Sequence, residues 1–251
     1  MDPIVMQAML AADERHWWYR GRRRVIRAEL DRMELPVGAA ILDAGCGSGR
    51  TMQELAAYGT VSGIELSDDA AEIARARGVG EVVIGRLEEL PWPPEHFDLT
   101  TCLDVLEHTP DDRATLAELR RVSRPGGHLL LTVPAYPWLW SIHDEVNHHY
   151  RRYTRAMLRA AARDSGWAIE GMSSFNSLLL LPAAVVRLSR RWRARRRRRE
   201  NPAAAYTDEL SIGPSWLNGV LEWPLALEAR WLRRGGTLPA GLSLLAILRR
   251  G

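Results

Sequence analysis

The chain of 251 residues contains no lysine, so all 34 of its basic residues are arginine. Without lysine it cannot carry the Tyr-x-x-x-Lys pair that many NAD(P)-dependent oxidoreductases use. Cysteine is almost as scarce, with only Cys46 and Cys102. Two cysteines make no disulfide framework, and this usage is typical of a protein kept in the reducing cytoplasm.

Long apolar segments are also missing. The first residues, MDPIVMQAMLAADERHWWYR, show no basic leader followed by an apolar stretch, so we expect no signal peptide. The apolar stretch 178–186 is too short to cross a bilayer and contains Pro182. These absences predict a cytoplasmic protein.

Positive charge is concentrated in one place. The net charge is +3, yet nine arginines lie between Arg187 and Arg199, so the rest of the chain is mildly acidic. An anionic partner is therefore to be sought at this run. The apolar stretch before it suits an interfacial helix on an anionic membrane, which predicts peripheral attachment at the inner membrane surface. A solvated basic segment and a nucleic-acid patch are the alternatives.

Strand-like and helix-like segments alternate over the first two thirds of the chain, as in AAILDAG, RTMQELAAYG, TVSGIEL and SDDAAEIARARG. Such alternation predicts an α/β fold with a parallel sheet covered by helices. We expect four parts. They are an N-terminal helical lid at 1–36, a core at 37–175, a helical, arginine-rich insertion at 176–240, and a final strand of the core at 241–251.

The strongest motif is DAGCGSG at 43–49, which follows an apolar strand and precedes a helix. Glycines allow the sharp turn and the close approach of a ligand, and the N–H groups at the start of the helix offer hydrogen bonds. Glu65 ends the next strand, 20 residues after Gly45, where an acid can accept from both ribose hydroxyls. Arg50 stands where the dinucleotide fingerprint G-x-G-x-x-G needs its last glycine, which disfavours NAD(P).

Four segments together resemble a class I S-adenosylmethionine-dependent methyltransferase, in the branch that includes the ubiquinone-pathway O-methyltransferases. They are ILDAGCGSGRTMQEL, VSGIELS, GRLEELPWPPEHFDLTTCLDVLEH and LRRVSRPGGHLLLTVP, in family order over about residues 37–135. The resemblance implies a Rossmann-like, seven-stranded, mostly parallel sheet with an antiparallel last strand. It also implies S-adenosylmethionine as cofactor. We expect a small-molecule acceptor, or a lipid-linked one if the insertion lies on a membrane, with the methyl group going to oxygen rather than to nitrogen or carbon.

The resemblance further implies which residues contact the cofactor. They are Asp43, Gly45, Cys46, Gly47, Gly49, Glu65, Leu66, Arg86, Leu87, Leu103, Asp104, Trp17 and Arg22. Glu65 would hold the ribose, and Leu66 would lie beside the adenine. Many relatives carry an acid where Arg86 stands, so the contact to the adenine amino group differs here. Trp17 and Arg22 lie in ERHWWYRGRR, a segment that would form a lid, although plain packing of an amphipathic helix explains it equally.

Two polar clusters are candidates for the acceptor side, where an oxygen needs a general base or a metal to lose its proton. One is DVLEH at 104–108, at the end of the fourth strand, and the other is HDEVNHHYRRY at 143–153. The catalytic candidates are His108, His143, Asp144 and His148. The candidates for substrate binding are Glu107, Tyr136, Arg151, Arg152 and Tyr153. A divalent metal stays open, because the spacing matches no firm metal signature.

Two other functions stay in view. One is an NAD(P)-dependent oxidoreductase on the same fold class, and the other is a non-catalytic module that binds S-adenosylmethionine. The sequence argues against a nucleobase-methylating enzyme, since such enzymes usually carry an Asn/Asp-Pro-Pro-aromatic motif after the fourth strand, where this chain has LDVLEH. Fold alone does not decide among these functions.

Overall fold

The computed structural model describes residues 12–13, 16–185 and 215–251. The chain folds into two compact units, each built from three stretches of sequence. The sheet unit comprises Met33–Pro134, Tyr153–Ser173 and Leu244–Gly251. The helical unit comprises Met1–Arg32, Ala135–Arg152 and Ser174–Ser243, as far as these are described.

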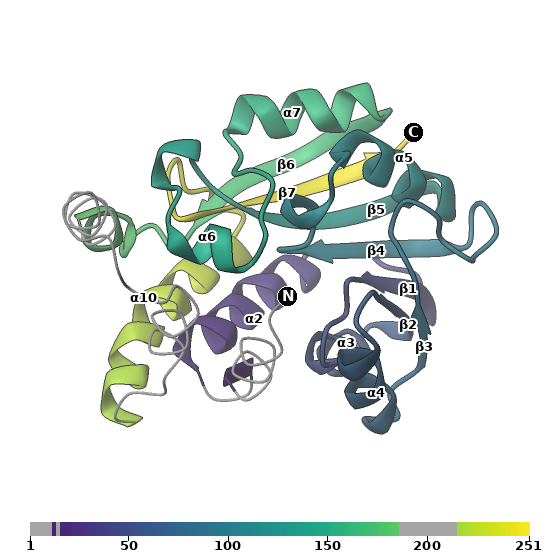
Figure 1. The fold of residues 1–251 in the computed structure, drawn as a ribbon, viewed down its shortest axis with the longest axis horizontal. Helices are drawn as coiled ribbons and strands as arrows, with labels where there is room; N and C mark the ends of the chain where they lie inside the picture. Colours follow the sequence, from purple (N-terminus) through teal and green to yellow (C-terminus); the bar gives the residue numbers. More distant parts are fainter. Residues whose placement is uncertain (1–11, 14–15, 186–214) are drawn as a thin grey trace. The chain divides into compact units, whose positions relative to one another are not determined.

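One seven-stranded sheet organises the sheet unit, in the order β3-β2-β1-β4-β5-β7-β6 (Figure 1). The strands are β1 (Ala39–Ala44), β2 (Gly59–Glu65), β3 (Glu81–Ile84), β4 (Phe97–Leu103), β5 (Ser123–Pro134), β6 (Trp167–Phe175) and β7 (Ser243–Arg250). The pairs from β3 to β5 are all parallel. The last strand, β7, lies between β5 and β6 and runs opposite to β4 (Figure 1). The expected Rossmann-like sheet with an antiparallel last strand is confirmed.

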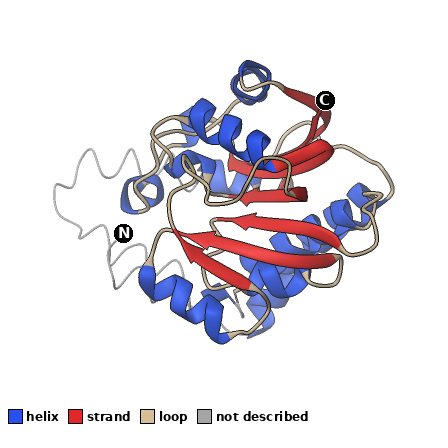
Figure 2. Ribbon diagram, turned by 90° about the vertical axis from the view of Figure 1, so that its right-hand side faces the viewer, coloured by secondary structure: helices blue, strands red, loops and turns tan. Residues whose placement is uncertain are grey.

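Helices lie against this sheet (Figure 2). They are α3 (Arg50–Leu55), α4 (Asp68–Ala76), α5 (Asp112–Val122) and α7 (Arg155–Asp164), with the short helix η1 (Leu106–His108) after β4. Side-chain caps fix where they start: Ser67 accepts from the N–H of Ala70, and Asp111 accepts from two N–H groups of α5. The central strands β1 and β4 are almost entirely buried, as expected for strands covered by helices.

Two long helices, α2 (Trp17–Leu30) and α10 (Ser215–Arg233), pack side by side in the helical unit (Figure 1). Gly21 of α2 allows the close approach, since a Cβ there would lie 2.3 Å from Cδ1 of Leu225. The same unit holds η2 (Pro137–Leu139) and α6 (Ile142–Val146), which follow β5. In the described residues, no helix is long and apolar enough to span a membrane.

The sequence-based boundaries divide the chain differently. They assign the N-terminal helices, the segment after β5 and the insertion to three parts, whereas in the structure these three belong to one unit. The expected insertion does separate the last two strands, with β6 ending at Phe175 and β7 beginning at Ser243. The run Arg187–Arg199, to which an anionic partner was assigned, lies outside the described residues.

Candidate functional site

The glycine-rich segment forms a tight loop between β1 and α3, held against the next strand. The N–H groups of Gly45 and Cys46 both donate to the carbonyl of Ile64, at 2.8 and 3.0 Å. Gly45 and Gly47 have φ values of +79° and +53°, a region that glycine enters without steric cost. A Cβ on Gly45 would lie 2.5 Å from Val105, so the chain also passes too close there for any side chain. Gly45 therefore has no room for a side chain, whereas at Gly47 it is the left-handed backbone that favours glycine.

The carboxylate of Glu65 lies at the centre of the loop's hydrogen bonds. Its Oε2 accepts from the N–H of Gly47 at 2.9 Å, and its Oε1 accepts from the N–H groups of Leu66 and Ser67 at 2.9 and 3.0 Å. These bonds orient the acid at the carboxyl end of β2, where an open α/β sheet binds its ligands. Asp43, at the end of β1, is buried and accepts from the hydroxyl of Thr101 at 2.7 Å.

These residues fit S-adenosylmethionine. Glu65 is an ionisable acceptor suited to ribose hydroxyls, and the loop offers backbone N–H groups at the start of α3. A Cβ built on Gly47 meets no atom within 4 Å, so the backbone is bare on the side where a ligand would approach. Gly45, Cys46 and Gly47 would hold the amino-acid part of the cofactor, and Glu65 would hold its ribose.

Replacing Gly47 by alanine separates the two reasons for glycine. The added methyl group meets no neighbour. Without cofactor, the unfolding free energy should therefore fall only by the cost of a left-handed alanine, about 1–2 kcal/mol. We expect cofactor affinity in calorimetric titration to fall by about 100-fold, or about 2.8 kcal/mol, which exceeds this cost, because the methyl group occupies the ligand's side of the loop. Gly219→Ala, at another glycine without neighbours, is the control. Equal losses of stability and of binding would contradict a ligand at this loop.

The residues expected at the adenine differ in exposure. Leu66 is 65% exposed, as suits an apolar side chain that a flat ring can cover, whereas Leu87 is buried. Arg86 is exposed, and its side chain forms an ion pair with Glu88 at 3.5 Å. Arg86 is therefore paired within its own loop, and its expected contact with the adenine stays a prediction.

The end of β4 carries the first acceptor-side cluster. Asp104 has a φ of +57°, uncommon for a residue other than glycine, and its N–H donates to the carbonyl of Thr132. Glu107 is buried and His108 half-buried in η1. Leu103 is buried beside them, so it contributes apolar packing at this end of the sheet.

Both cysteines are free thiols buried in the sheet unit. Burial, followed by the negative charge of Asp43 and other nearby acids, raises the pKa of the Cys46 thiol, and burial likewise raises the pKa of Cys102. A thiol with a raised pKa is a poor nucleophile at neutral pH. Cys46 therefore contributes packing to the loop, and neither cysteine is a candidate for covalent catalysis.

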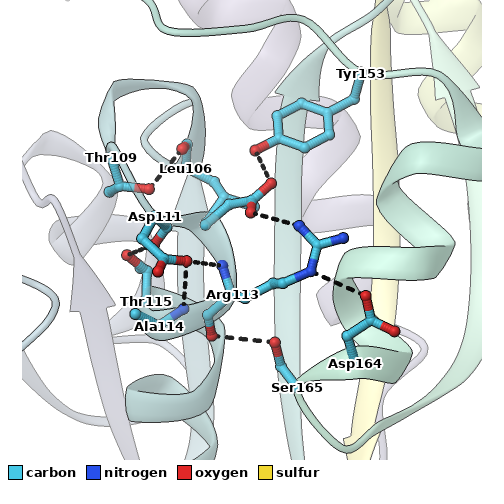
Figure 3. A network of polar contacts seen from close by, with 10 residues as sticks. Leu106, Thr109, Asp111, Arg113, Ala114, Thr115, Tyr153, Asp164 and Ser165 are labelled. Carbon is cyan, nitrogen blue, oxygen red and sulfur yellow. Dashed lines mark hydrogen bonds and ion pairs between the residues drawn. The ribbon is translucent and has the colours of Figure 1, made fainter.

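Tyr153 is a core residue, contrary to the expected contact with substrate. It is 1% exposed, and its hydroxyl donates to Oδ2 of Asp112 at 3.0 Å (Figure 3). Arg113 then joins Asp112 to Asp164, at 3.3 and 2.9 Å, and thereby connects α5 with α7. The aromatic ring and its hydroxyl are both used in this packing.

A second polar centre lies in the helical unit, around Asp144 of α6. Oδ1 of Asp144 contacts Nε of Arg152 at 2.7 Å and Nδ1 of His149 at 2.9 Å. Oδ2 accepts from the backbone N–H of Ser141 at 2.8 Å and closes a capping box. Burial alone would raise the pKa of Asp144, but the hydrogen bond with His149 and the charge of Arg152 outweigh it and lower that pKa well below its usual range. Asp144 is therefore an ionised, fully buried anchor.

This centre corrects two expected roles. Asp144 was expected to act in catalysis, but its side chain is 0% exposed and its oxygens are used by the loop. Arg152 was expected to bind an anionic substrate, but its side chain is 2% exposed, contacts Asp144 and also donates to the carbonyl of Ala135. Both residues position the loop. Sequence reasoning passed over His149, whose only signal was an acid five residues before it.

The other residues expected in this loop lie nearer the surface. His148 is exposed and has a φ of +55°, and Tyr136, also left-handed, stacks on Trp138 with ring centroids 5.7 Å apart. The ring of His143 lies 6.1 Å from that of His149. Arg151 is half-buried, with its guanidinium 6.0 Å from the ring centroid of Tyr150. Their roles at the acceptor stay predictions.

The expected lid residues belong to α2. The backbone N–H of Trp17 donates to Oδ1 of Asn218 on α10 at 3.2 Å, and Arg22 lies over the ring of Trp18 at 5.4 Å. Both side chains are half-buried. The first contact connects α2 with α10 and the second lies within α2, and contact of either residue with the cofactor stays a prediction.

The sheet order, the glycine loop and the acid at the end of β2 define a Rossmann-like methyltransferase. The comparisons agree: the sequence profile of the methyltransferase domain family matches residues 42–131. A ubiquinone biosynthesis O-methyltransferase of Thiobacillus denitrificans is 30% identical over 156 residues, which are 54% of this chain and 67% of that protein. That of Xanthomonas euvesicatoria is 30% identical over 162 residues, 57% and 67% of the two chains. The chain therefore belongs to the class I S-adenosylmethionine-dependent methyltransferases.

Solved structures support the fold. A chain in the complex between the Haloferax volcanii Trm112 methyltransferase activator and a putative methyltransferase matches with a TM-score of 0.62 at 20% identity, covering 99% of this chain and 98% of that one. A putative methyltransferase from Bacillus halodurans matches with a TM-score of 0.60 at 18% identity, covering 90% and 98%. Family membership also decides against the NAD(P)-dependent oxidoreductase.

Proposed function

We propose that the protein transfers the methyl group of S-adenosylmethionine to a hydroxyl oxygen of a small or lipid-linked acceptor. One observation carries the choice of oxygen: a buried carboxylate, Asp144, holds a histidine in the loop that follows β5. The names of the curated relatives, ubiquinone biosynthesis O-methyltransferases, support the same choice. Bound S-adenosylmethionine supplies a methyl group activated on a sulfonium.

His149 is the general base in this proposal. A carboxylate on one ring nitrogen of a histidine fixes its tautomer and stabilises the imidazolium that forms when the ring takes a proton. An acceptor hydroxyl would give its proton to His149 as its oxygen takes the methyl group. Arg152 and the capping box of α6 keep Asp144 ionised and in place, so that the histidine has a fixed orientation.

The identity of the reacting atom can be tested with matched acceptors. The purified protein would be given S-adenosylmethionine labelled in its methyl group, together with a phenol, the aniline of the same shape, and both with longer alkyl tails. We expect label in the phenols, with greater turnover as the tail lengthens. A parallel reaction with a metal chelator shows whether turnover needs a divalent ion. Cofactor binding without turnover on any hydroxyl acceptor would favour the non-catalytic module.

Replacing His149 by alanine should lower kcat by about 10²–10³-fold, the usual contribution of a positioned general base. The loss should be smaller at high pH, where the acceptor deprotonates without help, so the pH profile of kcat tests the role of the base. His148→Ala, at the exposed neighbouring histidine, is the matched control. If His148→Ala causes the larger loss, the base has been assigned to the wrong histidine.

We also propose that the protein works in the cytoplasm at an anionic membrane surface. The concentration of nine arginines in Arg187–Arg199 supports this, because basic clusters beside apolar segments bind anionic headgroups. The free state of Cys46 and Cys102 agrees with a reducing compartment. A lipid-linked acceptor would be concentrated at such a surface.

A further inference from the structure

Helix α10 has two apolar faces. One is buried in the helical unit and includes Leu225, Ala229 and Leu232, next to α2. The other consists of Val220, Trp223, Leu227 and Trp231, which are 59%, 62%, 38% and 53% exposed. We call these four residues the outer stripe. Their spacing of three and four residues places them along one side of the helix, opposite the buried residues.

Charge around the outer stripe is strongly one-sided. The acids of α2 and α10 are Glu29, Glu222 and Glu228, and all three are at most 5% exposed. Each has partners inside the unit: Glu29 with Arg32, Glu222 with two arginines of α2, and Glu228 with backbone N–H groups. The exposed charged side chains within the two helices are all arginines, namely Arg20, Arg24, Arg27, Arg230 and Arg233. One exposed acid, Asp31 at the C-cap of α2, pairs with Arg233 at 2.9 Å.

Trp231 is held in place by the chain that follows the helix. Its indole N–H donates to the carbonyl of Thr237 at 3.3 Å. A Cβ on Gly236 would lie 2.2 Å from Nε1 of Trp231, so the turn fits closely against the ring. A half-exposed indole fixed in this way loses little conformational freedom when its outer side is covered.

Glu228 connects α10 with a second group of exposed apolar side chains. Its carboxylate accepts from the N–H groups of Asn176, Ser177 and Leu178, at the start of the short helix at 180–185. In this segment Leu178, Leu181 and Val185 are 57%, 75% and 67% exposed. The arginine run follows directly in the sequence.

We infer that the outer stripe of α10 is a docking surface for an anionic lipid bilayer, with Trp223 and Trp231 seated at the level of the headgroups. The inference deepens the proposed attachment to an anionic membrane and rests on it. Charge decides for lipid over a second copy of the chain, because two arginine-rimmed surfaces repel each other while anionic headgroups attract them. Exposed tryptophan beside arginine, on a helix whose own acids are buried, is the pattern of an interfacial helix.

Flotation with vesicles tests the inference on the full chain without cofactor or acceptor. We expect binding to phosphatidylcholine vesicles that contain phosphatidylglycerol, and much weaker binding to phosphatidylcholine alone. The double variant Trp223→Asp/Trp231→Asp should lower the partition coefficient by about tenfold or more, because it removes two interfacial anchors and adds negative charge. Trp223→Ser/Trp231→Ser should show an intermediate loss. The matched control is Val37→Asp/Met157→Asp, at exposed apolar residues of the sheet unit.

A further variant, with Arg195–Arg199 replaced by glutamine, distinguishes the docking surface on α10 from the more general proposal that the protein attaches to an anionic membrane. Suppose that this variant loses binding while Trp223→Asp/Trp231→Asp binds like the wild type. The outer stripe is then not the docking surface, while the proposed attachment to an anionic membrane through the arginine run is kept. If the wild type binds no anionic vesicle, or binds single-stranded RNA instead, both the docking surface on α10 and the proposed membrane attachment are wrong. A dimer in gel filtration that the tryptophan variants dissolve would assign the stripe to a second copy and overturn the inference.

Discussion

Replacing Glu65 by alanine is expected to weaken S-adenosylmethionine binding by about 100-fold or more. Hydrogen bonds to a charged carboxylate contribute about 1.5–3 kcal/mol each, and the ribose can make two of them. The variant also removes the acceptor for three backbone N–H groups, those of Gly47, Leu66 and Ser67, so the loop itself loses support. Calorimetric titration with S-adenosylmethionine and S-adenosylhomocysteine measures the effect.

Two controls sharpen this experiment. Glu65→Gln keeps the shape and one carbonyl oxygen, so its affinity should lie between the wild type and the alanine variant. Glu72→Ala removes an exposed carboxylate from α4 and should leave affinity unchanged. Thermal melting of each variant verifies that the sheet unit is folded. Equal affinity of Glu65→Ala and Glu72→Ala would remove Glu65 from the cofactor site.

Replacing Asp144 by asparagine should cost about 3–5 kcal/mol of unfolding free energy, the usual effect of leaving a buried charge without its partner. The charge is that of Arg152, whose side chain is 2% exposed. The double variant Asp144→Asn/Arg152→Met should recover part of the loss, because it leaves no buried cation. Urea denaturation measures each value. Glu145→Gln, on the exposed side of the same helix, is the control. If Asp144→Asn unfolds at the same urea concentration as this control, the anchor role is wrong.

The same carboxylate gives the protein a dependence on acid. Since the folded-state pKa of Asp144 is lowered, its stabilising effect is complete above the unfolded-state pKa, about 3.9, and is lost as the pH falls towards the folded-state value. The wild type should therefore lose stability from about pH 4 downwards, and the asparagine variant should lose less over that range.

The glycine loop and the acid beside it could be placed in the fold because their signals are local, while their contact with the cofactor stays a prediction. The glycines, the apolar strand before them and the acid at the end of β2 all lie within residues 39–65, and the structure places the acid against the glycine loop. The acceptor side could not be predicted to the same depth. Which of His143, His148 and His149 meets Asp144 depends on the left-handed backbone at His148, and nothing in the residue types signals that turn. Tyr153 shows the same limit, because its partner Asp112 is 41 residues away.

The chain passes between its two units five times, and so the units are interleaved in sequence. The segment matched by the methyltransferase family, 42–131, lies wholly within one uninterrupted stretch of the sheet unit. In evolution, that stretch can be inherited as a single block, whereas the helical unit is encoded in three separate pieces that no single recombination event exchanges together. The helical unit would therefore change by point changes and by growth of its individual pieces, while the block matched by the family can be kept whole.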